Sequence, residues 1–93
     1  MRKGDVIGKQ LLRSGTAVAA NYRAVCRSRS KAEFISKISI VVEEADEAVF
    51  WLELLGDTAV APTEKLSLLL KEASELLAIC AASLRTAKQN KGA

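Results

Sequence analysis

The sequence has 93 residues, of which 49% are hydrophobic and 4% aromatic, and it contains no histidine. A chain of this length forms one domain, and without histidine it lacks the commonest general base and zinc ligand, which argues against an enzyme or a zinc protein. The net charge of +3 conceals a strong polarity: residues 1–31 carry eight bases and one acid, whereas residues 32–64 carry eight acids and one base. This segregation indicates a binding or assembly protein.

The first predicted helix covers residues 6–27. Asp5 is the expected N-cap, because its carboxylate can accept first-turn amide protons. The apolar face follows helical steps of three and four, through Ile7, Leu11, Ser14, Val18, Tyr22 and Val25. Gly8 and Gly15 keep this helix thin, so that a neighbour can approach closely. A second face carries four cations along about 27 Å, at ~1.5 Å per residue, namely Lys9, Arg13, Arg23 and Arg27.

The second predicted helix covers residues 31–55. Ser30 and Glu33 match a capping box at its start, and Gly56 is the expected C′ residue at its end. The main apolar face contains Phe34, Ile38, Val41, Val42, Ala45, Val49, Leu52 and Leu55. Four further apolar side chains lie off this face, and they predict an oligomer interface: Ile40, Phe50, Trp51 and Leu54.

The third predicted helix covers residues 62–88 and has Pro62 in its first turn. Leu68 and Ile79 lie outside its apolar face, which contains Leu66, Leu69, Leu70, Ala73, Leu76, Leu77, Cys80, Leu84 and Ala87. A short loop makes the second and third helices an antiparallel hairpin, with the first helix packed along it. The sequence therefore predicts an all-α, up-down helical bundle that forms a single domain over residues 1–93.

The reactive side chains lack the partners that catalysis needs. Cys26 and Cys80 lie far apart in apolar helical faces, so we expect two buried free thiols and neither a metal site nor a cofactor. The clustered acids Glu43, Glu44 and Glu47 lack the histidines of di-metal bundles; they either face solvent or pair with arginines of the first helix. No apolar run reaches the ~20 residues that span a membrane, so a cytoplasmic protein is the default.

The basic face is the strongest candidate for a function. Six cations on it and in the turn that follows can track the phosphate backbone of RNA or DNA: Lys9, Arg13, Arg23, Arg27, Arg29 and Lys31. The alternative is an ordinary solvated face, or one that pairs with acids of a second subunit. Tyr22 could stack on a base, but its place in the apolar face favours core packing.

Several segments, taken in order, point to a known family. They are Ile7–Arg23 (IGKQLLRSGTAVAANYR), Arg29–Ile35 (RSKAEFI), Glu43–Glu47 (EEADE) and Trp51–Leu55 (WLELL). Over about residues 4–88, the chain resembles the bacterial four-helix-bundle proteins of the 23S ribosomal RNA intervening-sequence family.

The resemblance implies a four-helix bundle that forms a homo-oligomeric ring, typically a pentamer, without enzymatic activity. A related branch serves as accessory proteins of diversity-generating retroelements, which implies RNA or DNA and a reverse transcriptase as partners. Family members have a further helix before the segment that begins at Met1, so one helix of the bundle is expected to be missing here. Two functions remain: a nucleic-acid-associated assembly factor, or a structural protein-interaction module that binds no nucleic acid. Arginines that are exposed in the oligomer favour nucleic-acid binding, whereas arginines buried against Glu43, Glu44 and Glu47 favour the interaction module.

Overall fold

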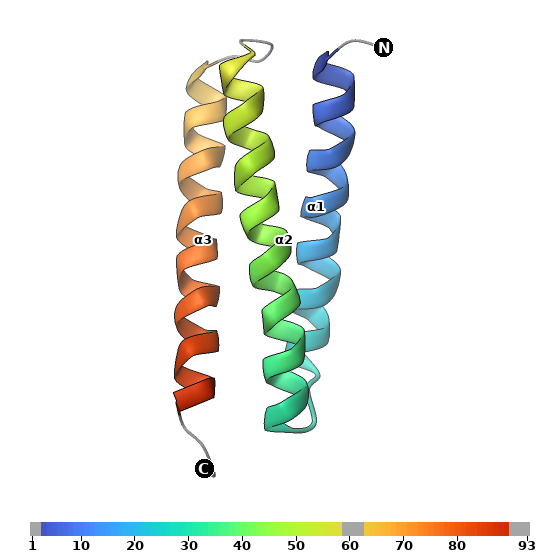
Figure 1. Cartoon of the computed structure of the whole chain (residues 1–93), viewed down its shortest axis with the longest axis vertical. Helices are drawn as coiled ribbons and strands as arrows, with labels where there is room; N and C mark the ends of the chain where they lie inside the picture. The colour runs from blue at the N-terminus through green and yellow to red at the C-terminus, as the bar shows by residue number, and fades with distance from the viewer. Residues whose placement is uncertain (1–2, 59–62, 90–93) are drawn as a thin grey trace.

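Three long helices make up the described part of the protein (Figure 1). A computed structural model describes residues 3–58 and 63–89, which form α1 (Lys3–Cys26), α2 (Lys31–Asp57) and α3 (Thr63–Gln89). The helices run alternately up and down with α2 in the middle, and no strand occurs within these ranges. The predicted all-α up-down architecture is confirmed, with helix ends within three residues of those expected.

Helix α2 is the centre of the fold because both other helices pack against it. Within the described ranges, the backbones of α1 and α3 each lie close to α2, whereas no Cα atom of α1 comes within 8 Å of a Cα atom of α3. The Cα envelope measures 49 × 22 × 14 Å, so the helices form a layer rather than a closed bundle. One side of α1 and one side of α3 are therefore left without a helix partner.

The core lies where α2 meets its two neighbours. Its central cluster contains Val25, Ile38, Val41 and Cys80, contributed by all three helices. Partly buried apolar side chains pack around this cluster, namely Val18, Phe34, Val42 and Leu84. Every one of these residues belongs to an apolar helical face or stripe that the sequence predicts, so the helical periodicity is what selects the core.

The predicted cap of α2 is confirmed, whereas the predicted cap of α1 is wrong. The Ser30 hydroxyl accepts the Glu33 amide at 3.0 Å, and the Glu33 carboxylate accepts the Arg29 amide at 3.4 Å. Helix α1 already begins at Lys3, so Asp5 lies inside the first turn instead of preceding it. A carboxylate at that position still interacts favourably with the positive end of the helix dipole.

The end of α2 also differs from the prediction. The helix continues through Gly56 to Asp57, and Thr58 caps it. The Thr58 hydroxyl donates to the Leu55 carbonyl at 2.8 Å, which satisfies one of the carbonyls left free in the last turn. Gly56 is thus an ordinary helical residue, and Pro62 lies outside the described residues.

Several residues of the predicted apolar faces are exposed. Cys80 is buried, and burial raises the pKa of its thiol, but Cys26 is exposed, so the prediction of two buried thiols is wrong for Cys26. Tyr22 is 49% exposed, and Leu69 and Leu76 are similarly accessible. The prediction of core packing for Tyr22 is therefore wrong. The physical reason is that the backbones of α1 and α3 do not come close together, so the sides that carry these residues have no adjacent helix to cover them.

Candidate nucleic-acid interface

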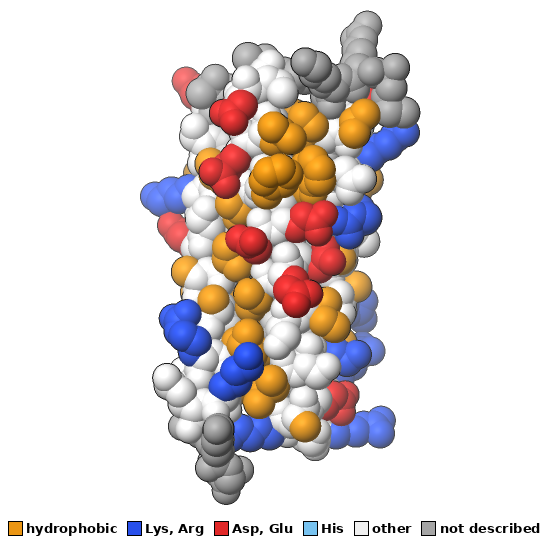
Figure 2. All heavy atoms as spheres, viewed as in Figure 1, with side chains coloured by type: hydrophobic (Ala, Val, Ile, Leu, Met, Phe, Trp, Pro, Cys, Tyr) orange, Lys and Arg blue, Asp and Glu red, His pale blue; other side chains and the backbone are white. Residues whose placement is uncertain are grey.

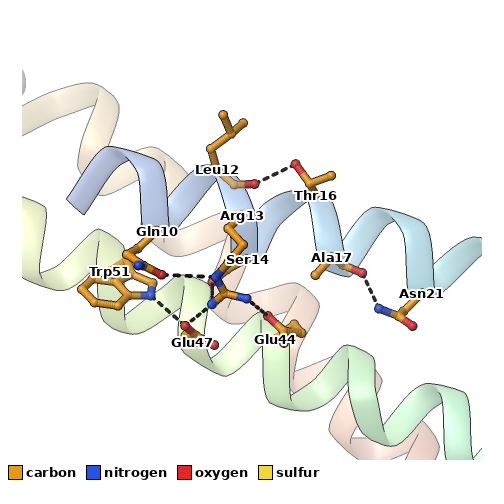
Figure 3. A network of polar contacts seen from close by, with 10 residues as sticks. All are labelled: Gln10, Leu12, Arg13, Ser14, Thr16, Ala17, Asn21, Glu44, Glu47 and Trp51. Carbon is orange, nitrogen blue, oxygen red and sulfur yellow. Dashed lines mark hydrogen bonds and ion pairs between the residues drawn. The ribbon is translucent and has the colours of Figure 1, made fainter. Parts of the chain in front are cut away.

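Arg13 connects the basic helix α1 to the acidic helix α2 (Figure 3). Its guanidinium donates to Glu44 Oε2 at 3.4 Å and forms a closer ion pair with Glu47. It also donates to Gln10 Oε1 at 3.2 Å and to the fully buried Ser14 hydroxyl at 3.1 Å. The predicted pairing of α2 acids with an arginine of the first helix is confirmed for Glu44 and Glu47, within one chain.

Glu47 is the meeting point of this network. Its carboxylate accepts the Trp51 indole N–H at 3.1 Å as well as the Arg13 guanidinium. The hydrogen bond from Arg13, followed by that from Trp51, lowers the pKa of Glu47, and the same bond to Glu47 raises the pKa of Arg13. The pair is solvent-accessible, with 48% of the Arg13 side chain exposed, so it fixes the register of α1 on α2 more than it adds stability.

A second group of cations surrounds a hollow at the α1–α2 turn. Arg23 comes from the last turn of α1, Arg27 and Arg29 come from the connection that follows it, and Lys37 comes from the second turn of α2. We call this group of four the basic hollow. The acid among its lining residues is Glu33, whose carboxylate already accepts the Arg29 amide. The basic hollow therefore places four positive charges against one partly engaged negative charge.

The structure divides the six cations that the sequence nominates into separate groups. Arg23, Arg27 and Arg29 are exposed and gather at the basic hollow, whereas Arg13 is engaged with α2. Lys9 is exposed but lies 14 residues from Arg23, about 21 Å along the helix.

Lys31 and Lys37 lie differently with respect to the basic hollow. The Lys31 amine is buried and has no hydrogen-bond partner in the described part of the chain. Lys37, which the sequence analysis did not nominate, lines the basic hollow. The sequence does carry a feature that could have identified Lys37. It is the one base among residues 32–64, and it lies one helical turn after Glu33.

The predicted interface residues lie on α2, with Phe50, Trp51 and Leu54 near its end and Ile40 ten residues before Phe50. Phe50 is 53% exposed and Ile40 is at the margin of exposure, while Trp51 and Leu54 are partly buried. Phe50 and Trp51 meet edge to face, with ring centroids 4.9 Å apart. Figure 2 shows an apolar patch toward the α2–α3 end of this face, acidic side chains beside it, and basic side chains at the α1–α2 end.

Other kinds of site find no support in the described ranges. Residues 3–58 and 63–89 bring together no group of three histidine, cysteine or acidic side chains that could hold a metal ion. None of the helices described is both long and apolar enough to cross a membrane.

Comparisons with known proteins identify the family and agree with the fold. The sequence model of the family described as 23S rRNA-intervening sequence protein matches residues 2–82. The chain is also similar to a crystal structure from Bacteroides thetaiotaomicron, described as a protein with unknown function from the S23 ribosomal protein family. Sequence identity is 35% with a TM-score of 0.79, over 85% of this chain and 73% of that one. No curated protein matches.

Proposed function

Since the chain belongs to the 23S rRNA-intervening sequence protein family, we propose that it is a non-enzymatic, oligomeric helical-bundle protein that binds RNA or DNA through the basic hollow. The observation that carries this proposal is the gathering of Arg23, Arg27, Arg29 and Lys37 at one turn. Guanidinium groups suit phosphate because their planar donors match two phosphate oxygens at once.

The kind of recognition follows from the side chains present. Contacts from arginine and lysine to phosphate position a nucleic acid without reading its bases. Phosphate contacts also release counterions, so affinity falls steeply with salt. The hollow contains no aromatic side chain that could stack on bases. Binding should therefore be strong at low salt and nearly independent of base sequence.

Oligomerisation would multiply this surface. The side chains of Ile40, Phe50, Trp51 and Leu54 are the proposed contact between subunits, because large, partly exposed aromatic side chains often dominate the energetics of interfaces. A ring, with the pentamer as the size that the family resemblance implies, repeats the basic hollow once per subunit. Binding at several hollows raises the overall affinity above that of one.

A protein-interaction module without nucleic-acid binding is the second candidate. The observation that favours it is the Arg13 network, in which a basic side chain of α1 already pairs with Glu44 and Glu47 of α2. The basic hollow could receive acidic side chains of another protein in the same way. A reverse transcriptase belongs among the protein partners to be tested.

The test is a titration of fluorescein-labelled single-stranded RNA and DNA of two unrelated sequences, at several salt concentrations, with poly-glutamate as a competitor of equal charge. If each chain contacts up to four phosphates, the log–log slope of affinity against salt is about −3 per subunit engaged. Equal binding of both sequences with such a slope supports the proposal. Absence of binding at low salt, or displacement by poly-glutamate at equal charge, favours the interaction module instead.

A further inference from the structure

The basic hollow is confined to one end of the molecule instead of running along it. The space that it surrounds has a volume of about 610 Å³, and sites for small ligands typically measure ~300–1,000 Å³. A strand of nucleic acid is usually followed by a long basic groove with aromatic platforms, and the lining of the hollow contains no aromatic side chain. The shape therefore suits one compact group better than a run of nucleotides.

Small side chains on α1 keep the hollow open. Ala20 and Ala24 line it, and their methyl groups leave room between α1 and α2. Arg27 lies four residues after Arg23, and its amide donates to the Ala24 carbonyl at 3.1 Å, so the chain is still turning there. The two arginines therefore lie about one helical turn apart, ~6 Å along the axis, above a floor of alanines.

The second wall of the hollow is fixed by the cap of α2. The Glu33 carboxylate accepts the Arg29 amide at 3.4 Å, and the Ser30 hydroxyl accepts the Glu33 amide at 3.0 Å. These two hydrogen bonds hold the backbone from which the Arg29 side chain extends. Lys37 follows Glu33 by one helical turn, on the same side of α2. Cations from both walls therefore line one space.

The charges that line this space are not neutralised by acids of the described chain. Within residues 3–58 and 63–89, the ion pairs are formed by Arg13 and not by Arg23, Arg27, Arg29 or Lys37. Like charges held close together repel one another, and a bound anion relieves that repulsion. The ligand that fits is compact and carries several negative charges.

A polyphosphate chain meets this requirement better than a nucleic-acid backbone does. Successive phosphates of a backbone are separated by a sugar and carry one charge each. The phosphates of a polyphosphate share a bridging oxygen, and a terminal phosphate carries about −1.5 to −2 at pH 7. A space of this size therefore encloses more negative charge when it holds a polyphosphate. Guanidinium groups, which donate to two phosphate oxygens at once, suit such a chain.

We infer that the basic hollow binds a polyphosphate chain, as carried by the 5′-triphosphate end of an RNA or by a free nucleoside triphosphate, in preference to backbone phosphates. This inference rests on the proposed function, because it names the part of an RNA that the same hollow receives. The alanine floor determines how deeply the chain enters, and Lys37 supplies the charge from the α2 side.

The test compares three RNAs of one sequence that end in a 5′-hydroxyl, a 5′-monophosphate or a 5′-triphosphate. Each carries fluorescein at its 3′ end and is too short to reach a second hollow of an oligomer, and anisotropy is measured without divalent cations. The 5′-triphosphate RNA should bind about tenfold or more tightly than the 5′-hydroxyl RNA, with the 5′-monophosphate RNA much closer to the latter.

Competition distinguishes the two sources of the polyphosphate. Unlabelled ATP and inorganic tripolyphosphate are added to the complex with 5′-triphosphate RNA. Displacement at concentrations similar to that of the RNA assigns the hollow to free polyphosphates, whereas displacement only at a large excess assigns it to the RNA end. Tripolyphosphate alone should also raise the Tm of the protein, because it binds the folded state.

Two variants with matched controls locate the site. Lys37→Gln should bring the 5′-triphosphate and 5′-hydroxyl RNAs within about threefold of each other. Lys71→Gln removes the same charge from an exposed α3 position and should retain the preference. Ala20→Leu changes no charge but fills the floor, so it should weaken the 5′-triphosphate RNA about tenfold. Ala78→Leu, at an exposed α3 position outside the hollow, is its control, and circular dichroism confirms the fold of each variant.

The outcomes separate this inference from the proposed function. Equal affinity for the 5′-triphosphate and 5′-hydroxyl RNAs overturns the inference and leaves the proposed function intact, because backbone phosphates then account for binding. Equal affinity for the 5′-monophosphate and 5′-triphosphate RNAs also overturns it, as does an undiminished preference in both Lys37→Gln and Ala20→Leu. If no RNA binds, the proposed function fails. A rise in Tm with tripolyphosphate that Lys37→Gln abolishes then upholds a free polyphosphate as the ligand, and no rise overturns the inference.

Discussion

Replacement of Gly15 by alanine should stabilise the protein. Gly15 lies in the interior of α1, and a Cβ added there meets nothing within 4 Å, so the methyl group has room without any shift of a neighbour. Glycine in a helix interior is about 1 kcal/mol less favourable than alanine, mainly because it loses more backbone freedom on folding. No steric term opposes this gain at position 15.

Gly56 is a useful comparison, because it is also a helical glycine but a Cβ atom there has less room than at Gly15. A Cβ at Gly56 would lie 3.2 Å from Cδ2 of the buried Leu66 side chain, so that side chain has to move by a few tenths of an ångström. The strain of this movement offsets the stabilisation that alanine gives over glycine in a helix. We therefore expect Gly15→Ala to raise the free energy of unfolding by about 1 kcal/mol, and Gly56→Ala to raise it clearly less or to lower it.

Thermal unfolding followed by circular dichroism, at one fixed protein concentration, measures the difference. For a domain of this size, a gain of 1 kcal/mol corresponds to a rise in Tm of about 4–8 °C. Gly8→Ala should give a similar rise for the same reason. A fall in Tm for Gly15→Ala would refute the reasoning, because it would mean that this side of α1 is tightly packed in the isolated protein.

Three further predictions concern the core, the network and the interface. Val41→Ala, at a fully buried position, should lower the free energy of unfolding by about 2 kcal/mol in urea denaturation, since two buried methyl groups are lost and a cavity remains; a change near zero would contradict the assigned core. The pKa of Glu47 is lowered in the folded state, so its contribution to stability is complete above the ordinary glutamate pKa and is lost as pH falls through the folded value. Stability should therefore fall more between about pH 7 and pH 3 for the wild type than for Glu47→Gln; parallel losses would contradict this assignment. Trp51→Ala should reduce the oligomer mass in light scattering, and an unchanged mass would remove the proposed interface.

The helices and their faces could be predicted because both are local properties. A repeat in steps of three and four, together with Ser30 and Glu33 at a helix start, determines where α2 begins and which side is buried. Gly56 misled the prediction because glycine also occurs within helices, and the end of α2 depends on the Thr58 cap instead.

The candidate site was harder to predict because it depends on distances between helices. Sequence spacing places Arg13 in a continuous basic stripe, but its reach to Glu44 and Glu47 depends on how α1 packs on α2. The same packing brings Lys37 next to the arginines of the turn. The exposure of Tyr22 likewise follows from the distance between the backbones of α1 and α3, which periodicity alone does not specify.

The most direct test of the central proposal compares two triple variants in one RNA-binding assay. Arg23, Arg27 and Arg29 are replaced by alanine in one variant, and three exposed cations of α3, Lys65, Lys71 and Arg85, are replaced in the other, so that both lose the same charge. Affinity for labelled single-stranded RNA is measured at low salt, with oligomer mass confirmed for each protein. We expect the first variant to bind about tenfold or more weakly than the wild type and the second to bind within about twofold of it. Equal losses in the two variants would contradict a localised phosphate-binding surface at the basic hollow.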